Sequence, residues 1–156
     1  MPFNPFKKNT PMRRMNLRQL RESTLEIRKL NSRFCVIDRT KIGKMKDGTR
    51  FVAAIIHSTK VQYSNGDFLV KGQDEPQSYV TVINFLDANA NVKVACSCLD
   101  YLYRWEYANT QKGAADIEYC NGQAPVITNP SQRAGLCKHL TALMNHIAPM
   151  LDRAHA

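Results

Sequence analysis

Apolar residues recur at three- and four-residue spacing in two stretches of the chain, a pattern that predicts two amphipathic helices. The first helix is predicted over residues 17–31, and Asn16 with Gln19 three residues later is typical of an N-terminal cap. The second is predicted from about Gly135 to Met150. The periodic positions are Leu17, Leu20, Thr24, Ile27 and Leu30 in the first stretch, and Leu136, Leu140, Leu143, Met144, Ile147 and Leu151 in the second.

Between the two helices, segments rich in β-branched and aromatic residues alternate with turn signals, as in an antiparallel meander. The predicted strands cover residues 34–41, 50–59, 61–63, 67–70 and 78–86, and Asp47-Gly48 and Asn65-Gly66 mark two of the turns. In residues 79–86 both alternating sets are mainly apolar. This strand is therefore predicted to be central in the sheet and covered on both faces, with the first helix as a candidate cover.

The next predicted strand ends in two cysteines. By the two-residue period of a strand, Cys96 and Cys98 share one face with the valines before them, so both thiols are expected to point the same way. After a spacer of 38 residues, Cys137 and His139 follow. Three thiolates and one imidazole are the complete ligand set of a tetrahedral Zn²⁺ site. Such a site is predicted to be structural, because a catalytic zinc keeps a position open for water or substrate.

The second ligand pair also predicts its own local structure. Inside a regular α-helix, Cys137 and His139 would be splayed by about 200°, so Cys137 is expected at the unwound start and His139 in the first turn. Before this pair, a helix is predicted over residues 101–112, with Asp100 as its cap and Gly113 as a left-handed terminator. Residues 117–128 are predicted to form a small hairpin or a long loop. The aromatic residues of the 101–112 segment also alternate as in a strand: Tyr101, Tyr103, Trp105 and Tyr107.

Other assignments of these residues stay open at the sequence level. Cys120 lies between the two pairs and could replace His139, which would give a four-cysteine site. An iron–sulfur site with the same ligands and a set of ordinary buried thiols are lesser alternatives. Cys35 is interpreted as a small buried side chain in a strand.

The whole-chain composition restricts the class of protein. At 156 residues with 44% apolar content, the chain fits one globular domain, and it has neither an apolar run long enough to cross a bilayer nor a signal-peptide segment. No membrane partner is expected. Five cysteines, an odd number with two of them one residue apart, fit a metal site in a reducing compartment better than a disulfide framework. We therefore expect synthesis in the cytoplasm.

The net charge of +9 is concentrated near the N-terminus. Residues 1–50 hold 14 Lys and Arg against four acids, whereas residues 51–156 hold eight against nine. Three prolines among residues 1–15 favour an extended basic arm. Contact with partners, either protein or the phosphates of DNA or RNA, is therefore expected in this region. The candidate residues are Lys7, Lys8, Arg13, Arg14, Arg18 and Arg21.

The order strand, Cys-x-Cys, spacer, Cys-x-His, helix resembles the SWIM-type zinc finger over residues 92–150. The resemblance implies that Cys96, Cys98, Cys137 and His139 are zinc ligands, in a family thought to bind DNA or proteins. The spacer is longer than the usual gap of that family. The segments at 96–108 and 135–140 also look like small SWIM-like proteins of tailed bacteriophages, which implies a virion component.

The patterns together predict an α+β fold in three parts. These are an extended basic arm at 1–15, a helix with an antiparallel sheet at 16–91, and a SWIM-like zinc module at 92–156 that forms one compact domain with the sheet. The chain contains none of the motifs of zinc deaminases, zinc proteases or phosphate-binding loops, so no enzyme activity is expected. The expected function is that of a zinc-stabilised assembly protein of a virion. The alternative is a cytoplasmic nucleic-acid-binding protein that uses the basic residues of 7–33, with a structural zinc.

Overall fold

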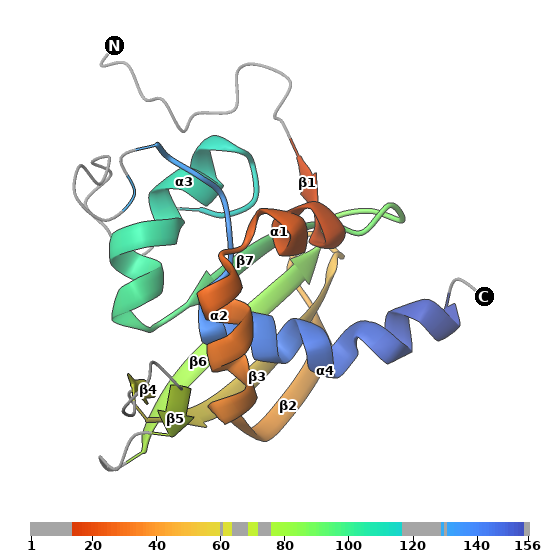
Figure 1. Ribbon diagram of the computed structural model, residues 1–156. Helices are drawn as coiled ribbons and strands as arrows, with labels where there is room; N and C mark the ends of the chain where they lie inside the picture. The colour runs from red at the N-terminus through yellow and green to blue at the C-terminus, as the bar shows by residue number, and fades with distance from the viewer. Residues whose placement is uncertain are drawn as a thin grey trace.

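The computed structural model describes residues 14–59, 61–63, 69–71, 76–116, 129 and 131–154. Helices from both ends of the chain pack against an antiparallel sheet (Figure 1), which confirms the predicted α+β class. In chain order the elements are β1 (Met15–Asn16), α1 (Leu17–Ser23), α2 (Glu26–Asn31), the 3₁₀ turn η1 (Ser32–Phe34), β2 (Val36–Lys44), β3 (Arg50–Ser58), β4 (Val61–Tyr63), β5 (Leu69–Lys71), β6 (Gln77–Phe85), β7 (Asn91–Cys96), the π-helical turn η2 (Tyr101–Trp105), α3 (Glu106–Gln111) and α4 (Lys138–Ala154).

The main sheet has five strands in the order β1-β7-β6-β3-β2, and all its pairings are antiparallel. Its four long strands follow one another as the predicted meander, with β4 and β5 forming a separate hairpin between β3 and β6. The register aligns Ala54 of β3 with Thr81 of β6, and Thr81 with Cys96 of β7. The first metal-ligand candidate therefore stands in a row of inward-facing residues of the sheet.

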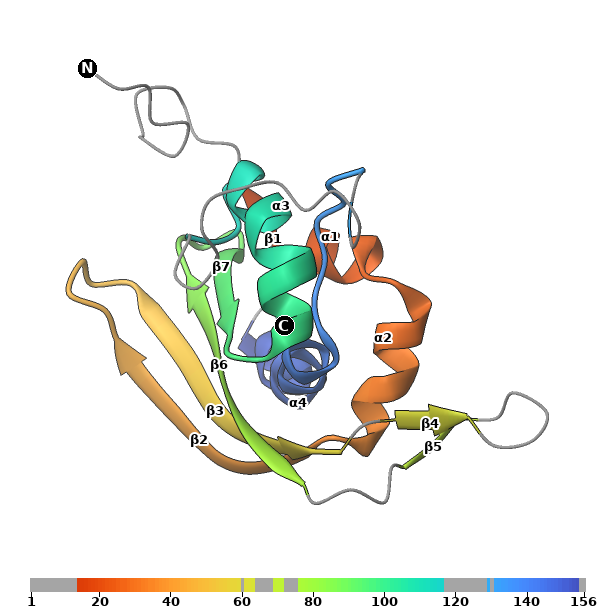
Figure 2. The same ribbon diagram turned by 90° about the vertical axis from the view of Figure 1, so that its left-hand side faces the viewer.

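One face of this sheet carries the core. Figure 2 shows the helices on that face, with α4 lying across β6 and β7. Strand β6 is central, as predicted, but the prediction that both its faces are covered is wrong. Val80 is 52% exposed, because the described helices all lie on the opposite face. The buried apolar residues on the covered face include Ala54, Ile56, Ile83, Val92 and Val94 from the strands, and Leu140, Leu143 and Ile147 from α4.

The N-terminal helix is divided, which the apolar periodicity did not predict. The predicted cap at Asn16 is confirmed, since its side chain accepts the N–H of Gln19 and the Gln19 side chain accepts the N–H of Asn16. The helix then stops at Ser23, and Thr24 has an extended backbone. Thr24 Oγ1 donates to the Leu20 carbonyl and accepts the N–H of Leu136, at 2.7 and 3.0 Å. A tertiary hydrogen bond thus fixes the break between α1 and α2.

The predicted helix over 101–112 forms in two parts. A π-helical turn, η2, leads into α3, and Gly113 ends the helical segment with a φ of 75°, as predicted. The prediction that Asp100 caps this helix is wrong, because its carboxylate binds side chains instead of helix N–H groups. Tyr101 and Trp105 are buried on one face, as expected for a helix, and the strand alternative is excluded.

Some predictions fall on residues that the structure does not describe. These are the Asn65-Gly66 turn, the hairpin or loop at 117–128 with Cys120, and the arm up to Arg13. In the described part of the chain, no helix is long and apolar enough to cross a membrane.

Candidate metal centre

The four predicted ligand residues come together in the core. Cys96 is the last residue of β7, Cys98 lies two residues beyond it, Cys137 immediately precedes α4, and His139 is in the first turn of α4. Their ligand atoms all lie within 4.8 Å of one another. All four residues are at most 4% exposed. The structure therefore contains a buried group of three cysteines and one histidine that could hold a metal ion.

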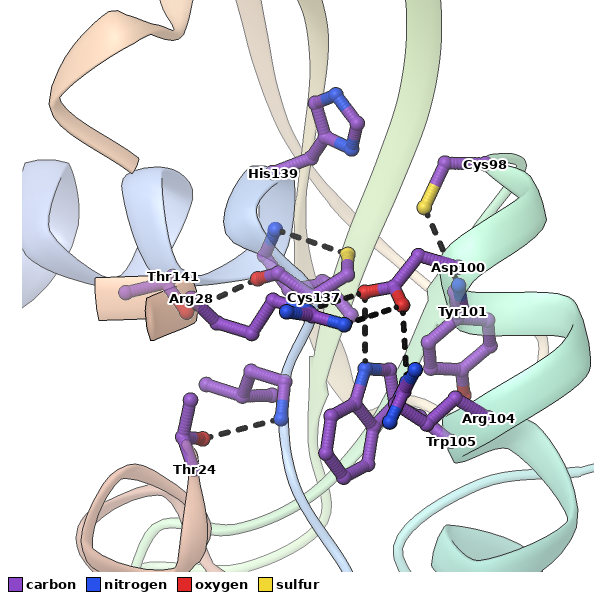
Figure 3. A network of polar contacts seen from close by, with 12 residues as sticks. Thr24, Arg28, Cys98, Asp100, Tyr101, Arg104, Trp105, Cys137, His139 and Thr141 are labelled. Atoms are coloured by element: carbon purple, nitrogen blue, oxygen red, sulfur yellow. Dashed lines mark hydrogen bonds and ion pairs between the residues drawn. The ribbon is translucent and has the colours of Figure 1, made fainter. Parts of the chain in front are cut away.

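Two of the thiols lie at the start of helical turns. Cys98 Sγ accepts the N–H of Tyr101 at 3.3 Å, and Cys137 Sγ accepts the N–H of Leu140 at 3.5 Å (Figure 3). Each acceptor sulfur thus receives an N–H group from the third residue after it. N–H groups at a helix start carry partial positive charge, so both contacts favour the thiolate form that binds metals.

The histidine is oriented by groups on both sides of its ring. His139 Nδ1 lies 3.9 Å from Cys96 Sγ, on the side of the thiols. Nε2 lies 2.6 Å from Ser58 Oγ at the end of β3, and the ring centroid is 4.3 Å from that of Tyr79. With a metal on Nδ1, the proton resides on Nε2 and is donated to Ser58 Oγ. This arrangement fixes both tautomer and ring orientation, as the outer contacts of metal-bound histidines do.

The geometry fits one tetrahedral ion. Zinc–sulfur bonds of about 2.3 Å in a tetrahedron place neighbouring donor atoms roughly 3.5–3.8 Å apart, close to the 3.9 Å between Cys96 Sγ and His139 Nδ1. Separations of at most 4.8 Å also fit a single ion better than an iron–sulfur cluster, whose ligands are divided between two irons. Soft thiolates with one imidazole are typical of zinc, and the group is consistent with a zinc-binding site.

Burial and mutual hydrogen bonds shift the pKa values of the three thiols in different directions. Burial raises the pKa of Cys96 and of Cys137. Hydrogen bonds from Cys137 and Cys96, together with His139, lower the pKa of Cys98. A divalent cation would favour the thiolate at all three positions.

Cys35 lies outside this group, although it packs against the same core. Burial raises the pKa of its thiol to about 11, with Lys138 lowering it and Cys98 raising it further. The interpretation of Cys35 as a buried side chain in a strand is wrong, because Cys35 lies between η1 and β2 and is only partly buried. Cys120 lies outside the described residues, and in the described part of the chain it is His139 that completes the group.

Side chains position the extended segment that leads to Cys137. The Asn109 amide donates to the Gly135 carbonyl at 2.8 Å and accepts the Gly135 N–H at 2.9 Å. Thr24 Oγ1 accepts the next N–H, that of Leu136. The buried segment has no strand partner among the described residues, so these contacts satisfy backbone groups that would otherwise be buried unpaired. They also bring Cys137 to Cys96 and Cys98.

An ion-pair network ties α2 to the turn that follows Cys98. Asp100 accepts two hydrogen bonds from the Arg28 guanidinium, at 2.8 and 2.9 Å, and further ones from Arg104 and Trp105 Nε1 (Figure 3). The Trp105 ring is buried under the same turn, and its edge lies close to Gly135, where an added Cβ would come within 3.0 Å of it. The network therefore connects the turn that follows Cys98 with the segment that precedes Cys137.

Sequence reasoning identified the four members of the buried group and missed the residues that orient them. Ser58 occupies the inward-facing row of β3 with Ala54 and Ile56, and a lone hydroxyl in an apolar row is a signal for a buried polar contact. The position of Asp100 before a predicted helix favours a capping role, whereas in the structure it is the acceptor for Arg28. No sequence pattern relates residues 72 positions apart.

The predicted partner-binding residues are not part of the metal centre. Arg14 pairs with Asp87 at 2.8 Å, Arg18 pairs with Glu22 on the surface of α1, and Arg21 is exposed in the last turn of α1. Lys7, Lys8 and Arg13 lie outside the described residues. Their role in partner binding stays a prediction.

No protein-family model, curated protein or solved structure matches this chain. The family stays unassigned. The similarity to SWIM-type zinc fingers rests on the order of the four candidate ligands in the chain, and the structure brings these four residues together in one buried group.

Proposed function

We propose that the chain binds one Zn²⁺ through Cys96, Cys98, Cys137 and His139, and that the ion stabilises the fold without taking part in catalysis. The observation that carries this proposal is the burial of all four donors within 4.8 Å of one another. Four protein donors leave no position for water or substrate. The ion would join the end of β7 to the start of α4, and its binding free energy would become part of the folding free energy.

We further propose that this zinc-stabilised domain is an assembly component of a tailed-phage virion. The similarity of the 96–108 and 135–140 segments to small phage proteins supports this role. The uneven charge also supports it, because the basic N-terminal arm is joined to a half of the chain that carries equal numbers of acids and bases from Cys96 onward. The arm would contact neighbouring subunits while the zinc-bearing part supplies a rigid support.

Purified particles test the assembly role. The chain should copurify with them at a fixed number of copies per particle through density-gradient and salt washes. A chain that is abundant in the lysate and absent from washed particles would contradict the assembly role. That outcome would leave the zinc proposal standing, since zinc content is measured on the isolated protein.

Nucleic-acid binding is a second candidate function, favoured by the cations of α1. Arg21 and Arg18 are both exposed on this helix, and the Arg18–Glu22 pair is solvated, with side-chain exposures of 86% and 65%. An exposed pair of this kind contributes little to stability and leaves Arg18 accessible to a phosphate. Removal of residues 1–13 should weaken DNA binding and its salt dependence. Equal binding by the shortened and full-length chains would contradict a role of the arm.

A further inference from the structure

A basic pocket of about 550 Å³ lies where three distant parts of the chain meet. Arg14 lines it from the residue before β1, Lys112 from the residue after α3, and Arg133 from the segment before α4. Figure 1 shows these three elements at the same end of the molecule. The pocket is separate from the metal centre, because none of the four ligand residues lines it.

The charged side chains that line this pocket are all basic. No acidic residue is among the described residues that line it. Arg14 reaches Asp87 at 2.8 Å, but neither Lys112 nor Arg133 forms an ion pair within the described ranges. The remaining lining includes the polar side chains of Gln19, Ser131 and Gln132. Cations beside hydroxyl and amide groups are the side chains that bind phosphate oxygens in nucleic-acid complexes.

The wall that carries Arg133 is held in place before any ligand binds. The buried Asn129 amide donates to the Arg133 carbonyl at 2.8 Å and accepts the Arg133 N–H at 3.1 Å. The Arg133 guanidinium donates through Nε to the Ser23 carbonyl, which fixes the side chain against the end of α1. Between these contacts, Gln132 has a φ of 54°, a left-handed conformation that few residues other than glycine adopt. Such conformations persist where the surroundings impose them.

We propose that this pocket binds a phosphate group of a nucleic-acid backbone, with Arg133 and Lys112 as its principal contacts. Nucleic acid is favoured over a free phosphate because further cations follow these elements in the sequence. Arg14, which lines the pocket, is preceded by the basic residues of the N-terminal region, and α1, which contributes Gln19 and Ser23 to the lining, also carries Arg18 and Arg21. The proposal rests on the second candidate function and is independent of the assembly role.

The test compares two charge-matched double variants of the full, zinc-loaded chain. Lys112→Gln with Arg133→Gln removes two cations from the pocket. Lys41→Gln with Lys46→Gln removes two exposed cations from the β2–β3 hairpin, outside the pocket. Zinc content equal to that of the parent shows that both variants fold. Fluorescence anisotropy measures the binding of a mixed-sequence DNA duplex at NaCl concentrations from about 25 to about 200 mM. Phosphate contacts are strongly salt-dependent in this range.

The pocket variant should lose about tenfold or more in affinity, and its log–log salt slope should fall by about one, because the pocket is proposed to hold one phosphate. The control variant should change affinity by less than about threefold. Equal losses in both variants would overturn the proposal, as would a parent chain that does not bind the duplex at low salt. Sodium phosphate should displace the duplex from the parent more effectively than sodium chloride of the same ionic strength. A parent that binds inorganic phosphate but no duplex would contradict the nucleic-acid assignment.

Discussion

Ser58 Oγ lies 2.6 Å from His139 Nε2, although the two residues are 81 positions apart in the chain. This contact leaves His139 Nδ1 on the side of the three cysteines. The end of β3 therefore sets the orientation of a candidate ligand in α4. Outer contacts of this kind usually contribute about 10–100-fold to metal affinity.

Ser58→Ala should weaken zinc binding by about 10–100-fold while preserving the fold, because the imidazole loses the acceptor for its Nε2–H. The measurement is competition with a chromophoric chelator at fixed pH. Ser78→Ala is a matched control, since Ser78 Oγ lies 2.8 Å from His57 Nδ1, a histidine outside the ligand group. The same loss of affinity in both variants would contradict a specific role of Ser58.

Thr24→Val should destabilise the protein by about 1–3 kcal/mol, because the isosteric side chain leaves the buried Leu136 N–H without its acceptor. Thr24→Ser keeps the hydroxyl and should recover most of the loss. Urea unfolding of the zinc-loaded proteins gives both free energies of unfolding. If the valine variant were as stable as the serine variant, the hydrogen bond would not explain the break between α1 and α2.

Asp100→Asn should cost about 1–3 kcal/mol in the free energy of unfolding, because the carboxylate accepts two hydrogen bonds from a mostly buried Arg28. The comparison variant is Glu22→Gln, which breaks a solvated ion pair and should change stability by less than about 1 kcal/mol. Similar effects of the two substitutions would show that the Asp100 network does not anchor the turn after Cys98.

Asp87 should titrate well below an ordinary aspartate. Its pKa falls from 3.8 to about 2, chiefly through the Asn91 side chain and also through Arg14 and the N–H groups of Asn89 and Asn91. Since the folded-state pKa is the lower one, the stabilisation is present above about pH 4 and is lost as the pH falls toward 2. Carboxyl NMR titration should show a higher Asp87 pKa in Asn91→Ala than in the parent. In the control Arg18→Ala, the Asp87 pKa should stay at the parent value. An unshifted Asp87 in the parent would contradict these contacts.

The sequence predicts those features that depend on residues within a single helix or strand. The Asn16–Gln19 cap, the shared face of Cys96 and the valines of β7, and the placement of Cys137 before α4 all follow from local periodicity and spacing. Each depends on residues only a few positions apart, so the chain encodes it directly.

The incorrect predictions involve residues far apart in the chain. The break at Thr24 depends on Leu136, and the Asp100 carboxylate turns from its own helix to Arg28. Local propensity favours a continuous helix in the first case and a cap in the second. The hydrogen bond from the buried Leu136 N–H outweighs the helix preference at Thr24, and the Arg28 guanidinium outweighs the capping preference of Asp100. Neither partner can be identified before the fold is known.

The zinc content of purified variants tests the central claim most directly. The parent should hold one zinc per chain by mass spectrometry under native conditions, and Cys120→Ser should hold the same. Cys98→Ser, Cys137→Ser and His139→Ala should each lose the ion or bind it much more weakly, with loss of ordered structure around β7 and α4 in the cysteine variants. Full zinc content in His139→Ala together with loss in Cys120→Ser would contradict the proposed ligand set.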